Sequence, residues 1–81
     1  MKSYYVYAIR SLSKKYIYVG LTNNVQRRFS QHNAGKEKTT SFYKPFKLFF
    51  QEKFETRAET RKREKYLKSG CRKEYLKSLL K

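Results

Sequence analysis

The sequence contains no aspartate: its six acidic residues are all glutamates, against 21 lysines and arginines. A catalytic centre that holds two metal ions about 3.5–4 Å apart needs several convergent carboxylates, so this composition disfavours a two-metal centre. The single cysteine and the single histidine exclude a disulfide within the chain and a zinc cluster of Cys and His ligands. The three glycines do not form a glycine-rich phosphate loop.

Long apolar runs are also missing. No stretch approaches the ~20 apolar residues that span a bilayer, and the N-terminus lacks the apolar core of a secretory signal peptide. We therefore expect a protein of the reducing cytoplasm that has no membrane segment. A length of 81 residues corresponds to one small domain, which we take as residues 1–81.

Positive charge is what the chain has in excess, because its formal net charge is +15. A charge of that size on so short a chain indicates a polyanionic partner, for which nucleic acid is the first candidate and an anionic membrane surface the second. Aromatic residues make up 17% of the chain, so we expect much of the core to be aromatic.

A strand followed by a helix is the most informative local pattern. Residues 16–19 are β-branched or aromatic at every position, which is typical of a strand. Gly20 lets the backbone turn or approach another backbone closely. Asn23 and Gln26 have the spacing of a capping box, which predicts that a helix begins at the residue after Asn23. Gly35 follows where the end of that helix needs a left-handed residue.

The helical wheel of this segment separates its two adjacent arginines. With Val25 at zero, His32 falls at about −20° and Arg28 at about −60°, whereas Arg27 falls at about 200°. Arg28 and His32 therefore share a flank with the apolar stripe, and Arg27 points to water. Two interpretations carry equal weight at this point. Either Arg28 and His32 form a site, or Arg28 is a solvated charge and His32 is a satisfied histidine at the core edge.

The whole chain predicts the element order β-β-α-β-α-α. The expected strands cover residues 2–9, 16–20 and 46–54, and the expected helices run from about residue 24 to 34, from a second capping box at Thr56 and Glu59 to residue 68, and over residues 72–80. A symmetric hairpin between the first two strands places Tyr7 opposite Tyr18. Residues 36–45 form a polar loop that is available to a ligand. The fold class is α+β, with a small three-stranded, mainly antiparallel sheet and three helices packed on it.

Glu64 is the best-placed carboxylate for a single metal ion. On its helix it lies beside the core-facing side, near the wheel positions of Thr60 and Leu67. Because Mg²⁺ keeps most of its hydration shell, one carboxylate with several waters is a sufficient site. The competing interpretation is an ordinary ion pair between Glu64 and Lys68, four residues along the helix.

These patterns together resemble the signature of the GIY-YIG nuclease family. The matching residues are Tyr5-Val6-Tyr7, Tyr18-Val19-Gly20 after a hairpin, Thr22-Asn23-Asn24-Val25-Gln26-Arg27-Arg28 with His32, and Arg63-Glu64-Lys65-Tyr66-Leu67-Lys68. The match covers nearly the whole chain. It closely resembles the single-domain members that are similar to excinuclease C, a DNA-repair nuclease, and it implies a GIY-YIG-like fold.

The resemblance also implies roles for the matching residues. Tyr18 would act as the general base or orient the attacking water, with Tyr7 as its hydrogen-bonded neighbour. Arg28 would hold the scissile phosphate, and His32 would assist proton transfer. Glu64 would bind one Mg²⁺ or Mn²⁺ ion. The expected partner is nucleic acid, with DNA favoured over RNA, and the basic residues expected to contact it are Lys36, Lys38, Arg61 and Lys68.

Two departures from the family pattern bear on activity. Tyr5 stands where the signature begins with glycine, and Leu21 stands where the nuclease domain of excinuclease C carries a lysine. Both predict a weaker contact with phosphate or a lower rate. Our first hypothesis is a metal-dependent endonuclease that hydrolyses phosphodiester bonds by an activated water at a one-metal site. The alternative is a non-catalytic, basic nucleic-acid-binding module on the same fold.

Overall fold

The computed structural model describes residues 3–68 of the chain. The elements in these residues are β1 (Tyr4–Ser11), β2 (Ile17–Thr22), α1 (Val25–Asn33), α2 (Lys38–Ser41), β3 (Phe46–Phe54) and α3 (Arg57–Lys68). Among these residues no helix is long and apolar enough to cross a membrane.

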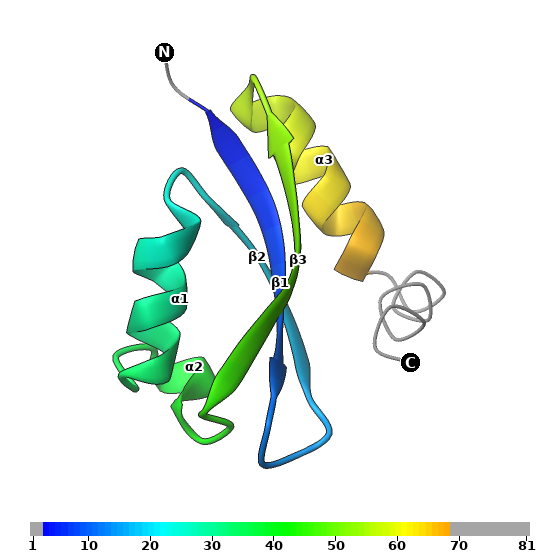
Figure 1. Ribbon diagram of the computed structural model, residues 1–81. Helices are drawn as coiled ribbons and strands as arrows, with labels where there is room; N and C mark the ends of the chain where they lie inside the picture. Colours follow the sequence, from blue (N-terminus) through cyan, green and yellow to red (C-terminus); the bar gives the residue numbers. More distant parts are fainter. Residues whose placement is uncertain (1–2, 69–81) are drawn as a thin grey trace.

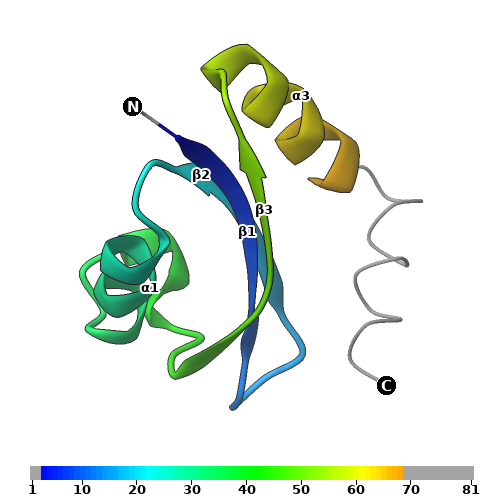
Figure 2. The same ribbon diagram turned by 45° about the horizontal axis from the view of Figure 1, so that its top comes forward.

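One antiparallel sheet of three strands forms the centre of the molecule, in the order β2-β1-β3. Helices α1 and α2 lie on one face of the sheet and α3 lies on the other (Figure 1). Figure 2, in which the view is turned, shows the same three layers, with the sheet between α1 and α3. The α+β class, the three-stranded antiparallel sheet and three helices packed on it agree with the prediction, but α2 precedes β3, so the order within residues 3–68 is β-β-α-α-β-α.

The central strand β1 is buried on both faces, and its alternating side chains divide the core in two. Val6 and Ala8 pack with Leu67 of α3, whereas Tyr7 and Ile9 pack on the side of α1. All five side chains have no exposed surface. Because side chains alternate along a strand, Tyr7 faces α1, and the candidate site lies on that face.

The register of the β1–β2 hairpin differs from the prediction. Tyr7 lies opposite Gly20, and Ile9 lies opposite Tyr18. The cause is Ser11, the last residue of β1, whose Oγ accepts hydrogen bonds from the backbone N–H groups at 3.2 Å and 3.0 Å in the loop that follows. These bonds shift the loop's centre by one residue, so each pairing shifts by two. Tyr7 and Tyr18 therefore stay on one face, as diagonal neighbours.

Helix α1 begins at Val25, so both its N-cap and its first residue lie one position later than expected. Asn24, and not Asn23, is the N-cap, and its Oδ1 accepts the backbone N–H of Arg27 at 3.1 Å. The reason is Thr22, whose Oγ1 accepts the N–H of Asn24 at 3.0 Å and so fixes the turn before the helix. Gly35 adopts a φ of 78°, the left-handed conformation predicted for it at the end of this helix.

The second capping box is confirmed. The Oγ1 of Thr56 accepts the backbone N–H of Glu59 at 3.2 Å and donates to its carboxylate at 3.0 Å, and α3 then runs to Lys68. The segment 36–45, expected to be a loop, contains the short helix α2, whose N-cap is Glu37. The helix expected over residues 72–80 lies outside the described residues.

Candidate active site

The ring of Tyr7 lies directly over the backbone of Gly20. A Cβ atom added at Gly20 would lie 2.6 Å from the Tyr7 Oη and 2.7 Å from its Cζ. No side chain fits at such distances, because neighbouring strands are only about 4.8 Å apart and the ring occupies the space above the glycine. The glycine of the Tyr-Val-Gly motif thus has a specific task, which is to let the phenol of Tyr7 cross β2.

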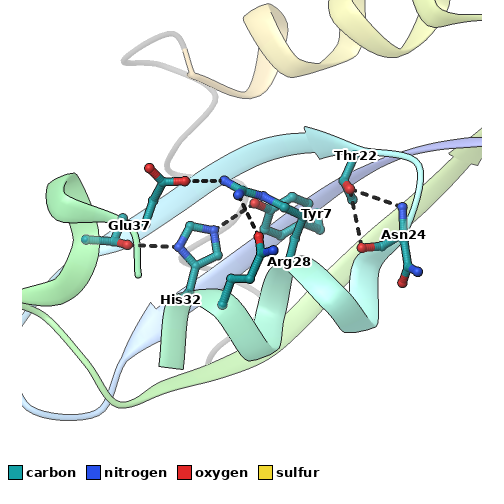
Figure 3. A network of polar contacts seen from close by, with 8 residues as sticks. Tyr7, Thr22, Asn24, Arg28, His32 and Glu37 are labelled. Carbon is teal, nitrogen blue, oxygen red and sulfur yellow. Dashed lines mark hydrogen bonds and ion pairs between the residues drawn. The ribbon is translucent and has the colours of Figure 1, made fainter. Parts of the chain in front are cut away.

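A buried chain of hydrogen bonds starts at that phenol. The Tyr7 Oη lies 2.8 Å from His32 Nε2, and His32 Nδ1 lies 2.8 Å from the Oγ1 of Thr40 on α2 (Figure 3). All three residues are fully buried. Burial lowers the pKa of His32, and the nearby guanidinium of Arg28 lowers it further. We therefore assign His32 as a neutral imidazole, in which one ring nitrogen donates and the other accepts.

The neighbouring Arg28 sets the direction of this chain. Its guanidinium acts to lower the pKa of Tyr7, and a cation beside the Tyr7 oxygen favours the arrangement in which the lone pairs of that oxygen face Arg28. The Tyr7 O–H is then free to donate to Nε2 of His32, and the Nδ1–H donates to Thr40. Burial, followed by the proximity of Tyr18, raises the pKa of Tyr7 to about 12 although Arg28 acts in the opposite sense. Tyr7 is therefore a protonated donor at neutral pH.

The guanidinium of Arg28 is held by two side chains. Its Nη2 lies 2.7 Å from the carboxylate of Glu37, and its Nη1 donates to the Gln31 side chain at 2.9 Å (Figure 3). Burial acts to lower the pKa of Arg28, but the hydrogen bond to Glu37 and the proximity of Tyr7 outweigh it and the pKa is raised. The same hydrogen bond from Arg28 lowers the pKa of Glu37. Both groups are charged at neutral pH.

The separation of the two arginines by the helical wheel is confirmed. Arg28 turns inward, with its side chain 27% exposed. Arg27 is exposed and donates to the Asn23 side chain at 3.1 Å. His32, in turn, has both ring nitrogens bonded and no exposed surface, so it is a satisfied buried histidine that also belongs to a polar network.

Tyr18 borders the network without a hydrogen bond to it. Its ring centroid lies 4.8 Å from that of His32 and 6.2 Å from that of Tyr7. The expected hydrogen bond between the two tyrosines is not formed, because Tyr7 donates to His32 instead. Among residues 3–68 the hydroxyl of Tyr18 has no hydrogen-bond partner, and the side chain is half-buried. The phenol is thus available to a ligand.

Glu64 lies on α3, and the sheet separates α3 from α1 (Figures 1 and 2). Its carboxylate is 19% exposed and pairs with Lys68 at 3.2 Å, which is the ion pair that the spacing of four residues predicts. No contact within residues 3–68 joins Glu64 to Arg28 or His32. Of the basic residues expected at the nucleic acid, Lys36 and Lys38 flank Glu37, and Arg61 lies on α3 with Lys68; all four are exposed.

A metal ion at Glu64 would rely on one protein ligand. Among residues 3–68 no three His, Cys, Asp or Glu side chains gather into a group that holds a metal. The Glu64 carboxylate is partly exposed, and its partner Lys68 has a half-exposed ammonium that an incoming cation can displace. One carboxylate plus water suits a hard, largely hydrated cation such as Mg²⁺ and does not suit zinc. The donor set therefore fits one water-rich ion.

Three residues of the network escaped the sequence analysis, and one of them, Gln31, lies on α1 three positions after Arg28 and accepts its hydrogen bond. Glu37 and Thr40 reach Arg28 and His32 because α2 folds back against α1. The sequence holds one signal for Glu37: it is the only acidic residue among residues 1–51. No comparable signal marks Thr40.

Comparison with known proteins identifies the family of this fold and network. The family model described as the GIY-YIG catalytic domain matches residues 3–77. The chain belongs to the GIY-YIG family. This membership places it in a family of nucleases that act on nucleic acid.

The GIY-YIG relatives include small proteins of similar length. The chain is 36% identical over 80 residues to the UPF0213 protein SH2523 of Staphylococcus haemolyticus, and the match covers 98% of this chain and 96% of the relative. It is 32% identical over 78 residues to the UPF0213 protein SSP2268 of Staphylococcus saprophyticus, with 95% and 94% covered. The solution NMR structure of the UPF0213 protein BH0048 from Bacillus halodurans is similar, with a TM-score of 0.57, 34% identity and coverage of 95% of this chain and 84% of that one.

Proposed function

We propose that the protein is a metal-dependent endonuclease that hydrolyses phosphodiester bonds of nucleic acid, with DNA as the favoured substrate, by means of an activated water. The observation that carries the proposal is the oriented guanidinium of Arg28, which is held by Glu37 and Gln31 and lies beside the buried pair of Tyr7 and His32 that Tyr18 contacts. A net charge of +15 brings a polyanion to this site. The GIY-YIG fold makes nucleic acid the natural polyanion.

Arg28 is suited to hold the scissile phosphate. A guanidinium has five N–H donors in a fixed plane, and the bonds to Glu37 and Gln31 leave donors for a ligand while they fix that plane. Donors that are oriented beforehand stabilise charge that develops in a transition state without a cost of reorganisation. Arg28 therefore binds the non-bridging oxygens and offsets their growing negative charge.

Tyr18 and the buried network divide the proton transfer. The hydroxyl of Tyr18, which has no hydrogen-bond partner within residues 3–68, orients or deprotonates the attacking water. His32 contacts the Tyr18 ring and, through its bond to Tyr7, holds the second phenol as a donor. Neutral His32 and protonated Tyr7 keep the positive charge of the site on Arg28.

Glu64 would hold one Mg²⁺ or Mn²⁺ ion from the other face of the sheet. Strand β2 is an edge strand within residues 3–68, so a substrate along its free edge is accessible from both faces. Helix α3 packs against β1 and β2, and Tyr18 is part of β2. A divalent ion supplies a Lewis acid for the phosphate and the leaving oxygen. Lys68 and Arg61, on the same helix, add positive charge for the nucleic acid, as Lys36 and Lys38 do near Arg28.

The alternative, a basic module that binds nucleic acid without cleaving it, is favoured by the ion pairs of the two key residues. Arg28 is partly neutralised by Glu37, and Glu64 is paired with Lys68. The carboxylate of Glu37 opposes a phosphate that binds the remaining donors of Arg28, and the Lys68 pair has to open before a metal ion is bound at Glu64. A module that never cleaves has no need to open that pair.

Single-turnover cleavage distinguishes the two. Purified protein is incubated with linear, flapped and branched DNA and with matched RNA, in Mg²⁺, in Mn²⁺ and in EDTA. We expect metal-dependent cleavage that is lost in Glu64→Gln while DNA binding persists. The control is Glu55→Gln, which removes the same charge from an exposed carboxylate outside the site. Binding of every substrate without cleavage in either metal would establish the alternative.

A further inference from the structure

A pocket of about 260 Å³ lies beside the first turn of α1. Its lining residues are Tyr5, Asn23, Asn24, Val25, Gln26 and Gln51. Gln26 and Arg28 are two positions apart on the helix, so they project about 160° from each other. The pocket therefore opens on the flank of α1 opposite to Arg28, towards β3, and it is a separate feature from the network of Tyr7, Arg28 and His32.

The composition of this lining differs from that of the chain. The sequence has six carboxamide side chains, three asparagines and three glutamines, and four of them line the pocket. None of the lining residues is charged, although 33% of the chain is charged. A phosphate would be met by lysine or arginine, so the lining selects a neutral polar ligand.

Two of the carboxamides are available to a ligand. Asn24 caps α1 through its Oδ1, and the Oδ1 of Asn23 accepts a bond from the Arg27 guanidinium. In contrast, the carboxamides of Gln26 and Gln51 are exposed and make no hydrogen bond within residues 3–68. Each therefore presents one donor group and one acceptor, side by side.

Tyr5 supplies the aromatic part of the pocket. It lies two residues before Tyr7 on β1, on the same face of the sheet, and is half-buried. It also stands where the family signature has glycine, a departure that the proposed reaction does not use. An aromatic ring in a pocket on a nucleic-acid-binding protein is a surface on which an unpaired base stacks.

We propose that this pocket binds one unpaired nucleobase, adenine in preference to the others, against Tyr5 and the carboxamides of Gln26 and Gln51. Asparagine and glutamine pair with adenine through its N6 donor and N7 acceptor. The pocket is smaller than the ~300–1,000 Å³ typical of clefts for larger ligands, which suits a base whose sugar and phosphate stay outside. A strand that occupies both this pocket and Arg28 crosses the start of α1 and is unpaired there. The proposal rests on nucleic acid as the ligand, and it does not require cleavage.

The test is a titration with adenosine monophosphate followed through the side-chain NH₂ signals in ¹H–¹⁵N NMR spectra. Only six Asn and Gln side chains contribute to that region. We expect the signals of Gln26 and Gln51 to shift, while that of Asn33, whose carboxamide is bonded to the backbone of Phe46, stays in place. Ribose 5-phosphate is the matched control without a base, and uridine monophosphate is the control for base identity.

Uridine monophosphate should bind at least about fivefold more weakly than adenosine monophosphate, as expected for one lost bidentate pair. Gln51→Leu, an exposed change on β3, should remove the preference and leave the fold intact. Equal shifts with ribose 5-phosphate, or no shifts with any of the three ligands, would overturn the proposal that this pocket binds a base. Equal affinity for the two nucleotides would overturn the choice of adenine. A protein that fails to cleave DNA but shows these shifts refutes the proposed enzyme and leaves the pocket in place.

Discussion

Glu37 places its carboxylate 2.7 Å from the guanidinium of Arg28. It is the only acidic residue among residues 1–51, a stretch that carries ten lysines and arginines. That single carboxylate pairs with the arginine beside Tyr7, and not with an exposed cation. A phosphate that approaches Arg28 therefore meets a negative charge already bound there.

Replacing that carboxylate tests its effect on the ligand. Glu37→Gln keeps the shape and a hydrogen-bond acceptor for Arg28 but removes the charge, so short oligonucleotides should bind about two- to fivefold more tightly, the range of a partly exposed ion pair. Fluorescence anisotropy at constant salt measures this. Glu55→Gln, which removes an exposed charge elsewhere, is the control for net charge. Equal gains in the two variants would show that Glu37 has no special relation to Arg28.

The adjacent arginines should differ sharply. Arg28→Ala removes the oriented donors of the site and should lower the single-turnover rate by about 10²–10³-fold. Arg27→Ala removes an exposed charge bonded to Asn23 and should change only the affinity, by a modest factor. The pair of variants has the same net charge, so a rate measured at saturating DNA separates the two effects. Equal losses of rate would contradict the placement of Arg28.

Tyr18→Phe removes a hydroxyl that has no partner within residues 3–68 and keeps the ring that contacts His32. The fold should be unaffected, and the rate should fall by about 10²–10⁴-fold, as for a lost general base. Tyr16→Phe is the matched control, because Tyr16 lies on the same face of the sheet, two residues away, and stacks on Tyr43 at 3.9 Å. An unimpaired Tyr18→Phe enzyme would refute the mechanism.

The metal site has its own test. Glu64→Gln should abolish metal-dependent cleavage and leave duplex binding nearly unchanged, because it alters one charge in a net +15. Paramagnetic broadening of backbone signals by Mn²⁺ locates the ion without reference to activity. In the native protein the broadening should centre on α3 and the facing part of β2, and it should disappear in Glu64→Gln. Broadening centred on Glu37 in both proteins would move the metal to the other face of the sheet.

Gly20→Ala tests the contact between β1 and β2. The added methyl group lies 2.6 Å from the Tyr7 Oη, and overpacking of this kind costs about 1–3 kcal/mol. For a domain of this size, we expect Tm to fall by at least about 4 °C. The ring of Tyr7 must move, so its ring NMR signals should shift together with those of His32. An unchanged Tm and unchanged His32 signals would show that the ring is free to avoid the methyl group.

Local signals explain why much of the fold was predictable. Strand β3 covers Phe46–Phe54 as expected, because an apolar run bounded by proline and a capping box is decided by nearby residues. The hairpin register was not predictable in this way. The hydroxyl of Ser11 accepts two backbone N–H groups of the loop, and the assumption of a symmetric hairpin does not take such hydrogen bonds into account. Helix α2 was missed as well, because four residues of lysine, serine and threonine carry no helical periodicity.

The candidate site likewise contains residues that the sequence could predict and residues that it could not. The wheel distinguished Arg28 from Arg27 because both positions belong to one regular helix. The partners Glu37 and Thr40 required the path of the chain after Gly35, which turns α2 back onto α1. A hydrogen bond that joins residues across a turn of irregular shape has no spacing rule, so only the three-dimensional structure reveals it.

The close approach of Tyr7 to Gly20 also makes the two positions interdependent during mutation. While the phenol occupies the space above β2, every side chain at position 20 is excluded, and while position 20 is bare, loss of the phenol leaves a void beside His32. In a library that randomises both positions, single changes at either should be depleted, and double changes that exchange the bulk of Tyr7 for a side chain at position 20 should be enriched among the folded clones. Such clones would keep the sheet but lose the hydrogen bond to His32. Selection for folding alone would therefore retain them, whereas selection for a function that needs the polar network would not.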